Sequence, residues 1–366
     1  MSNGIALVLG TRPEIIKLAP VIQACERRSV PHTLIHTGQH YSETLDSVFF
    51  DQLGLPDPDY NLGVGSADHG KQTGEMLIGV ERILQECDPE TVLVQGDTNS
   101  VLAGALAASK LDVRLGHVEA GLRSGDREMP EETNRTLADH AADRCFAPTE
   151  QSRDNLLAEG IPEERIEVTG NTVVDALERH KELARERTTA LADLGLDEDD
   201  YAVMTLHRAE NVDDPERFRA LLFGASRAGD SHGLPVVYPI HPRARERIEE
   251  FDITVPEPIR LVEPREYLEF IRLEDAASII LTDSGGVQEE ACILGTPCVT
   301  LRDNTERPET ISAGANVLAG PDPATIIHRV EEMIDTDGDW ENPFGDGTAG
   351  EQILQAVTRA PEEVPQ

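Results

Sequence analysis

The sequence predicts an α/β protein made of two Rossmann-like domains, whose parallel sheets face a cleft. Short, largely apolar runs alternate with longer amphipathic runs along the chain, as expected for buried parallel strands joined by helices. The chain has 366 residues, which is long for one domain and sufficient for two. Hydrophobic residues make up 39% and charged residues 28%, a balance that suits a folded chain rather than a disordered one.

The first half of the chain is predicted to form one sheet with covering helices. Its strands are expected at Ile5–Leu9, Thr33–His36, Thr91–Val94 and Val113–Val118. Its helices are expected at Glu14–Arg28, Val101–Leu111 and Glu132–Ala142. In the first helix Ile15, Leu18 and Ile22 fall mostly on one face, as in a helix that packs on a sheet.

The second half repeats this pattern. Its strands are expected at Ala202–Leu206, Pro235–Tyr238, Ile259–Val262, Ser278–Thr282 and Cys298–Leu301, with helices that include Pro215–Ala228 and Val287–Leu294. The break between the domains is placed near Gly170–Glu182, before a charged stretch typical of a solvated helix and linker at Glu182–Asp200. Domain one is therefore expected to span residues 1–175 and domain two residues 176–345. Ligands of such sheets bind beyond the carboxyl ends of the strands.

The charge of the chain excludes one class of partner. There are 69 Asp plus Glu against 32 Lys plus Arg, a formal net charge of −37, so a nucleic-acid partner is not expected. Only four of the basic residues are lysines, at Lys17, Lys71, Lys110 and Lys181. Excess carboxylate with few lysines favours a protein dispersed in molar salt, where the Debye length is ~3 Å. We expect a salt-rich cytoplasm, as in a halophilic archaeon; a merely acidic mesophilic protein is the alternative.

The apolar runs, the N-terminal residues and the cysteines limit which compartment and which chemistry are expected. No apolar run approaches the ~20 residues of a membrane-spanning helix, and the first residues lack a basic signal-peptide region, so a cytoplasmic protein without a membrane partner is expected. The five cysteines are odd in number and form no CxxC pair, which argues against a disulfide framework and a zinc site.

Two turns could bind an anion. Gly10-Thr11-Arg12-Pro13-Glu14 follows the first strand, and Arg12 and Lys17 lie near the start of the next helix, a place that favours phosphate. This is not a GxGxxG fingerprint, and an ordinary turn with an exposed arginine is an equal alternative. The run Thr282–Ala291 places free amides of Ser284, Gly285 and Gly286 at a helix start, a suitable cradle for a diphosphate. Glu290, one turn further, could accept hydrogen bonds from ribose hydroxyls; a glycine-rich packing turn is the alternative.

Three carboxylates could move protons. Asp97 and Glu119 each follow a buried strand, and Glu131 comes soon after. Carboxylates near one cleft can serve as acid and base on two faces of a substrate. Any single carboxylate of this acidic chain could instead be solvated surface, and Glu131 could simply belong to the first turn of a helix.

Three further residues follow strands of the second half. His207 lies at the end of its first strand and could protonate or stabilise a departing phosphate oxygen, or could have a structural role alone. His241 lies at the next strand end. Arg307, after the strand CVTL, could bind phosphate or sugar, or could form an ion pair with Glu306 or Glu309.

Ten motifs occur in an order that resembles one family. They are GTRPEIIKLAP, TGQH, QGDT, GHVEAGLRSGD, PEETNR, VTGNTVVDA, LHRAEN, TDSGGVQEEA, LGTP and TERPET. Together they resemble the non-hydrolysing UDP-N-acetylglucosamine 2-epimerases, from about Ile5 to a final helix near Glu351–Thr358. The resemblance implies a glycosyltransferase B type fold, with a C-terminal helix, residues 346–366, that crosses back to the N-terminal domain.

The resemblance also implies an activity. Such isomerases interconvert UDP-GlcNAc and UDP-ManNAc without NAD, metal or other cofactor, as homodimers, and serve polysaccharide biosynthesis. UDP leaves C1, 2-acetamidoglucal forms, a proton returns to the opposite face of C2, and UDP adds again. This chemistry needs a tightly held UDP, proton carriers on two faces and exclusion of water.

Residue roles are implied position by position. Asp97 and Glu131 would transfer the C2 proton, Glu119 would hold sugar hydroxyls or orient a partner, and His207 would assist phosphate departure. The implied substrate-binding residues are Arg12, Lys17, His241, Arg265, Phe270, Ser284, Gly285, Gly286, Glu290 and Arg307. Among them, Phe270 matches a position beside the uracil, and Arg265 stands where bacterial members often have Gln.

Two departures from the bacterial pattern concern regulation. Ala209 replaces a second arginine after the His-Arg pair, and the segment before Pro130 is shorter. Both put activation by substrate in doubt but leave the core chemistry in place.

Three other functions are alternatives to a non-hydrolysing epimerase. They are a hydrolysing epimerase that releases ManNAc and UDP, a glycosyltransferase of the same fold, and a catalytically silent UDP-sugar sensor.

Overall fold

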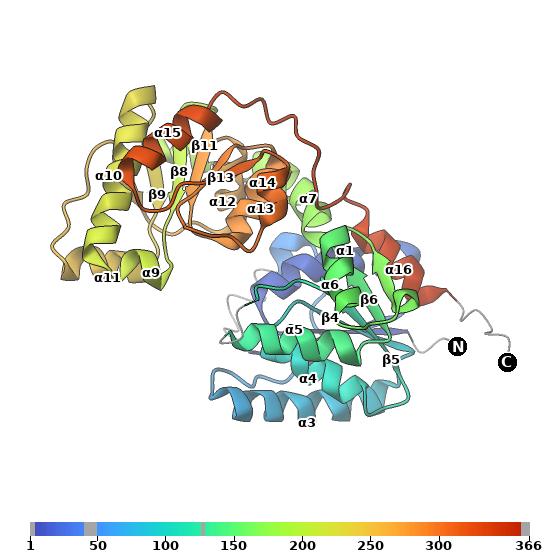
Figure 1. The fold of residues 1–366 in the computed structure, drawn as a ribbon. Coiled ribbons are helices and arrows are strands. Elements are labelled where there is room, and N and C mark those ends of the chain that lie inside the picture. Colours follow the sequence, from blue (N-terminus) through green and yellow to red (C-terminus); the bar gives the residue numbers. More distant parts are fainter. Residues whose placement is uncertain (1–3, 40–49, 126–128, 360–366) are drawn as a thin grey trace. The chain divides into compact units, whose positions relative to one another are not determined.

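The computed structural model describes residues 4–39, 50–125 and 129–359. It divides into two compact units, Met1–Ala176 with Phe344–Gln366, and Leu177–Pro343 (Figure 1). Two motif residues, His40 and Asp126, the N-terminal residues 1–3, and residues 360–366 of the expected C-terminal helix lie outside the described residues.

The first unit is built on a seven-stranded parallel sheet of order β3-β2-β1-β4-β5-β6-β7. The strands are β1 Ile5–Leu9, β2 His32–His36, β3 Tyr60–Asn61, β4 Thr91–Gln95, β5 Arg114–Val118, β6 Arg144–Ala147 and β7 Ile166–Val168. The order runs outward in both directions from the neighbours β1 and β4. Their carboxyl ends therefore form the topological switch point, where ligands of such sheets bind.

Helices cover this sheet, and the last one comes from the end of the chain. They are α1 Arg12–Arg28, α3 His69–Cys87, α4 Asn99–Ala108, α5 Pro130–Ala141, α6 Glu150–Ala158 and α16 Ala349–Thr358. α16 packs on α1, where Gly350 lies so close to Pro20 that a Cβ atom would meet it at 2.7 Å. Arg27 and Arg28 both pair with Glu351 at 2.7 Å.

The second unit contains a six-stranded parallel sheet of order β10-β9-β8-β11-β12-β13. The strands are β8 Ala202–Thr205, β9 Val236–Pro239, β10 Ile259–Val262, β11 Ile279–Thr282, β12 Cys298–Thr300 and β13 Asn316–Leu318. The helices are α8 Ala190–Leu194, α9 Ala209–Val212, α10 Pro215–His232, α11 Pro242–Glu250, α12 Tyr267–Asp275, α13 Gly285–Leu294, α14 Pro308–Ser312 and α15 Pro323–Met333. Here β8 and β11 flank the switch point.

Both faces of the second sheet are buried. Successive residues of a strand point to opposite faces. In β8 and β11 these alternate residues enter different apolar clusters: Met204 and Leu281 belong to one, Val203 and Ile280 to the other. This explains why the strands appear in the sequence as continuous apolar runs. Among the described residues, no helix is long and apolar enough to cross a membrane.

The predicted fold class, two α/β halves with parallel sheets, is confirmed. The differences concern helix α3, which has 19 residues and was not predicted, several short strands and helix ends. The sequence prediction missed β3, β6, β7 and β13, which have two to four residues each. α1 begins at Arg12, two residues before the predicted start, because Pro13 fits the first helical turn. The stretch expected to contain the break is helix α7, Thr172–Arg187, and the two units divide within it, after Ala176.

Candidate active site

In the first unit, three turns meet at the carboxyl ends of β1, β4 and β5. Gly10 makes the first turn possible, since a Cβ atom there would lie 2.0 Å from Thr37 Oγ1 and 2.3 Å from Ser100 Oγ. The next turn carries Gly96 and Asp97, and the third carries Glu119. Because β1, β4 and β5 are neighbours in the sheet, these turns form one edge.

A buried carboxyl group, Glu14, ties the first two turns together. It accepts hydrogen bonds from Gly10 N at 2.7 Å, from the Thr11 hydroxyl at 3.0 Å and from the Thr98 hydroxyl at 2.5 Å. Its side chain is almost fully buried. Burial raises the pKa of Glu14 to about 7, although the three donors act in the opposite direction.

Glu119 is held by an ion pair in an unusual backbone conformation. Its φ of 67° lies in the left-handed region, which non-glycine residues adopt at a cost and often at functional sites. Lys17 Nζ lies 2.5 Å from Glu119 Oε1, and the Gln95 amide donates to Oε2. Lys17, predicted to bind the nucleotide, is thus paired with a predicted catalytic carboxylate.

Asp97 is fixed by α5. Arg135 Nη2 lies 2.6 Å from Asp97 Oδ2, and the Asn134 amide donates to the Asp97 carbonyl at 2.8 Å. Both partners belong to the PEETNR motif. Glu131, also predicted to be catalytic, lies half-buried in the first turn of α5. Its neighbour Glu132 instead accepts hydrogen bonds from the amides of residues 124 and 125 and pairs with Arg135 at 2.6 Å.

In the second unit, a pocket of about 310 Å³ lies at the carboxyl ends of β8 to β11. Five predicted site residues line it: His207, His241, Arg265, Phe270 and Ser284. Pro239, Pro264 and Val287 supply apolar walls. Within the part of the chain that the structure describes, the buried Arg265 Nε atom has no hydrogen-bond partner. A pocket with apolar walls and a few polar groups is the usual form of a small-molecule site.

His207 is oriented by a buried residue that sequence reasoning missed. Asp283 Oδ1 lies 2.9 Å from His207 Nδ1, and its carboxylate also accepts the amides of His207 and Arg208. These bonds lower the pKa of Asp283 against the effect of its burial. The carboxylate therefore fixes a proton on Nδ1 and leaves Nε2 for a ligand. The available signal was position, because Asp283 directly follows β11 in the quoted TDSGG run.

The predicted anion cradle at the start of α13 is smaller than expected. The Ser284 amide is not free: it donates to Thr282 Oγ1 at 2.9 Å, a local turn that threonine favours. The Ser284 hydroxyl instead caps α13 by accepting from the Val287 amide at 3.4 Å. Within residues 4–39, 50–125 and 129–359, the amides of Gly285 and Gly286 have no hydrogen-bond partner on the backbone.

Glu290 and Arg307 each have a buried glutamate as a neighbour. Burial, and then the nearby Glu290 carboxylate, raise the pKa of the fully buried Glu274 well above its ordinary value. Arg307 Nε pairs with the buried Glu289 at 2.7 Å. Glu306, considered above as a partner of Arg307, pairs instead through its carboxylate with Arg302 at 2.7 Å.

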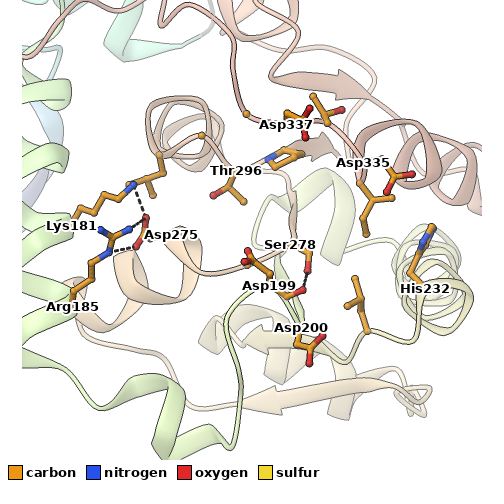
Figure 2. A pocket seen from close by; sticks show the side chains of 18 residues that line it. Lys181, Arg185, Asp199, Asp200, His232, Asp275, Ser278, Thr296, Asp335 and Asp337 are labelled. Atoms are coloured by element: carbon orange, nitrogen blue, oxygen red, sulfur yellow. Dashed lines mark hydrogen bonds and ion pairs between the residues drawn. The ribbon is translucent and has the colours of Figure 1, made fainter.

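A larger pocket of the second unit, about 630 Å³, lies at the opposite edge of the sheet (Figure 2). Its residues Asp200 and Ser278 precede β8 and β11, so they sit at the amino ends of these strands. Figure 2 shows Lys181 and Arg185 directed at Asp275, which they contact at 2.8 and 2.9 Å. The remaining charges labelled there are mostly aspartates, which would repel a diphosphate.

The fold and these clusters define a doubly wound α/β protein with clustered polar side chains at the carboxyl ends of its strands. The family model described as UDP-N-acetylglucosamine 2-epimerase matches residues 23–358. The chain belongs to this family.

Relatives agree with this assignment. The chain is 51% identical over 360 residues to the UDP-N-acetylglucosamine 2-epimerase of Methanocaldococcus jannaschii, covering 97% of this chain and 98% of that protein. It is 49% identical over 359 residues to the protein of the same name from Methanococcus maripaludis, covering 96% and 98%. The crystal structure of the M. jannaschii enzyme in complex with UDP-GlcNAc and UDP matches with a TM-score of 0.85 at 51% identity, covering 97% of this chain and 99% of that one.

Proposed function

We propose that this protein is a non-hydrolysing epimerase that interconverts UDP-GlcNAc and UDP-ManNAc. Family membership supports the epimerase activity. The observation that carries the mechanism is the arrangement of Asp97 and Glu119 at neighbouring strand ends, each paired with a cation at 2.5–2.6 Å. Such pairs fix the direction of Asp97, which would transfer a proton at C2, and of Glu119, which would contact the sugar.

The proposed reaction has two balanced half-steps. A carboxylate takes the C2 proton while the C1–O bond to UDP breaks and its electron pair leaves with the phosphate oxygen. The products are 2-acetamidoglucal and UDP. A proton then returns to the opposite face of C2, and the phosphate oxygen forms the C1–O bond again. We assign the proton transfers to Asp97 and Glu131, and we assign to Glu119 contacts with sugar hydroxyls.

The second unit would hold UDP. In our proposal His207 is oriented by Asp283 at Nδ1 and, with both ring nitrogens protonated, donates from Nε2 to the departing phosphate oxygen. The amides of Gly285 and Gly286, at the positive end of α13, would bind the diphosphate. Phe270 would stack on the uracil, and Glu290 would accept hydrogen bonds from the ribose. No metal or organic cofactor is required by these steps.

Proton NMR of the protein with UDP-GlcNAc in heavy water at molar KCl tests the reaction. Deuterium at C2 together with UDP-ManNAc is expected. Free ManNAc with UDP would mean a hydrolysing epimerase. An unchanged substrate with intact UDP binding would favour a glycosyltransferase without its acceptor, or a sensor.

The role of Asp97 has its own test. Asp97→Asn should abolish deuterium entry at C2 while UDP binding stays near normal, because the amide is a poor base. Asp88→Asn is the matched control: Asp88 ends α3 with φ 45°, a conformation that Asn also tolerates, and full activity is expected. Turnover by Asp97→Asn would contradict the assignment.

We further infer a homodimer, from the family resemblance, and a salt-rich cytoplasm, from the net charge of −37. Sedimentation analysis in molar KCl tests the first inference. The dependence of the melting temperature on KCl tests the second.

A further inference from the structure

β5 carries a histidine, His117, that the proposed reaction does not use. Its side chain is fully buried, and both ring nitrogens have a partner. Nδ1 lies 2.6 Å from Asp139 Oδ1 on α5, and Nε2 lies 2.8 Å from the carbonyl oxygen of Gly96. Gly96 directly precedes Asp97, so this ring contacts the turn that carries a predicted catalytic carboxylate.

The two hydrogen-bond acceptors that face the ring nitrogens of His117 determine how many protons the ring carries. A backbone carbonyl can only accept, and so can an ionised carboxylate. A neutral imidazole has one N–H, so one of its two contacts would set two lone pairs against each other. Only the imidazolium, with an N–H on each nitrogen, satisfies both partners.

Asp139 is held as an ionised carboxylate by two hydrogen-bond donors. Arg123 Nη2 lies 2.7 Å from Asp139 Oδ2, and the Gly121 amide donates to the same oxygen at 3.2 Å. Two donors on the second oxygen leave no place for a proton there. Burial works against the charge of Asp139, but His117 and Arg123 outweigh it and lower the pKa of Asp139.

The other groups around His117 favour the same state. Burial opposes the charge of the imidazolium, yet the Asp139 carboxylate and the Gly96 carbonyl raise the pKa of His117 above its ordinary value. Glu119, two residues further along the chain, acts in the same direction. The neighbouring strand β6 contributes Cys145, whose pKa burial raises to about 12, so its thiol stays neutral.

The contact between His117 and Gly96 helps to fix the turn that carries Asp97. Gly96 has φ 85°, and its amide donates to the Val118 carbonyl at 3.1 Å. β5 therefore holds this turn at both polar groups of Gly96, one of them through His117. The Asn134 amide then fixes the carbonyl of Asp97 itself.

We propose that His117 is a positioning residue: a permanently charged imidazolium whose Nε2–H holds the Gly96 carbonyl and thereby aims the Asp97 carboxylate at its substrate. This inference rests on the proposed function, because it gives His117 a role only where Asp97 moves a proton.

The charge of His117 can be measured without any activity. In protein labelled with ¹⁵N at histidine, both nitrogens of His117 should show the shifts of protonated nitrogen, unchanged from about pH 6 to 9. His180 is an internal reference: it is fully buried, and burial lowers its pKa to about 4, so it should appear neutral throughout. The signals are assigned by their loss in His117→Gln and His180→Gln. A neutral His117 at neutral pH would overturn the proposal.

The positioning role is tested with Asp139→Asn. Without the carboxylate, His117 should lose a proton as the pH rises, and its Nε2 lone pair would then face the Gly96 carbonyl. We expect kcat to fall on the order of 10²-fold at high pH, with recovery toward acid pH and little change of KM. A loss that is equal at every pH, or that falls on KM, would contradict the proposal.

His117→Gln provides a second test should Asp139→Asn fail to fold. Its amide can still donate toward Gly96, so it should keep more activity than His117→Leu, which has no donor. Equal activity of the two variants, at equal melting temperature, would contradict positioning through this hydrogen bond.

The proposed function and the role of His117 can fail separately. Absence of C2 exchange in the unsubstituted protein would contradict the proposed function. Normal turnover with a neutral His117 would contradict only the role of His117.

Discussion

At the scale of single residues, the carboxyl ends of the strands hold buried acids with opposite tendencies. Glu14 has three donors, yet its burial dominates and raises its pKa to about 7. Glu132 is also buried, yet the amides of residues 124 and 125 and the guanidinium of Arg135 outweigh burial and lower its pKa. These two glutamates should therefore influence stability in different ranges of pH.

Glu14→Gln should stabilise the protein at neutral and higher pH. Because the folded state binds the Glu14 proton more tightly than the unfolded state, Glu14 costs stability progressively from its unfolded pKa of 4.5 up to about 7. The variant removes this cost, which is on the order of 3 kcal/mol above pH 7. Urea unfolding of both proteins at fixed KCl, from about pH 5 to 8, measures the difference.

Glu132→Gln is the control of opposite sign. Its lowered pKa gives stability that is present above the unfolded pKa and is lost as the pH falls through the folded one. This variant should be less stable than the unsubstituted protein by a constant amount from about pH 5 to 8, and the gap should close only in acid. A gap between Glu14→Gln and the unsubstituted protein that does not change with pH would contradict the shift of Glu14.

Asp283→Asn should impair turnover more than binding. The neutral amide no longer supports a ring that is protonated on both nitrogens, so His207 would donate less well from Nε2 to the phosphate oxygen. We expect kcat to fall roughly 10²–10⁴-fold, the usual contribution of a positioned acid or base, with UDP affinity little changed. Asp322→Asn, an exposed helix cap at which Asn serves equally well, is the matched control. Normal kcat in Asp283→Asn would show that the orientation of His207 does not matter.

The sequence predicts where site residues lie better than what they contact. Asp97, Glu119 and His207 could be placed because each follows an apolar run that could only be a buried strand. Their partners Arg135, Lys17 and Asp283 are 38, 102 and 76 residues away, and no local pattern links them. The same limit applies to Arg307: the partners considered for it, Glu306 or Glu309, are near it in sequence, whereas α13 brings Glu289 to it from farther away along the chain.

At the scale of elements, glycine decides how closely helices and turns approach the sheet. Gly10 lies against the side chains of Thr37 and Ser100, so a Cβ atom there would overlap both of them. Gly74 lies within α3, and a Cβ atom at that position would meet no other atom within 4 Å. Two glycines of the same unit thus serve opposite purposes, and local sequence alone does not distinguish them.

Gly10→Ala should destabilise the first unit and weaken substrate binding. The added methyl group would overlap two hydroxyl groups and displace the turn that carries Arg12. Gly74→Ala should instead stabilise the protein by about 0.5–1 kcal/mol, the usual gain of alanine over glycine in a helix. Thermal unfolding of both variants measures the contrast, and a gain of stability in Gly10→Ala would contradict the close approach.

Short strands at sheet edges are one limit of sequence prediction at this scale. β3, β7 and β13 have only two or three residues and lie at sheet edges, so their side chains show no clear period. The long apolar strands β1, β4 and β11 were predicted within one residue of their bounds, because burial on both faces leaves a continuous signal.

At the scale of the whole molecule, acidic groups outnumber basic ones by 69 to 32. Even if every cation were paired, 37 carboxylates would remain without a partner, because 69 minus 32 is 37. Exposed pairs contribute only about 0.2–1 kcal/mol each, and salt weakens them. Repulsion among the unpaired carboxylates is screened by the same salt, and with this excess it should dominate.

The melting temperature should therefore rise with KCl between about 0.1 and 2 M, as the Debye length falls from ~10 Å to below ~3 Å. NaCl at equal concentration should act similarly, since screening depends on ionic strength. Differential scanning calorimetry measures the effect. A melting temperature that stays constant or falls would favour the merely acidic mesophilic protein.

The return of the chain to its first unit affects the order of events during synthesis. The second unit, Leu177–Pro343, is one continuous segment and can fold as soon as it leaves the ribosome. The first unit leaves earlier, but α1 lacks its neighbour α16 until residues 349–358 have been translated. The part of α1 that α16 contacts, which includes Pro20, stays uncovered until then, so the half that is made first is the half that is finished last.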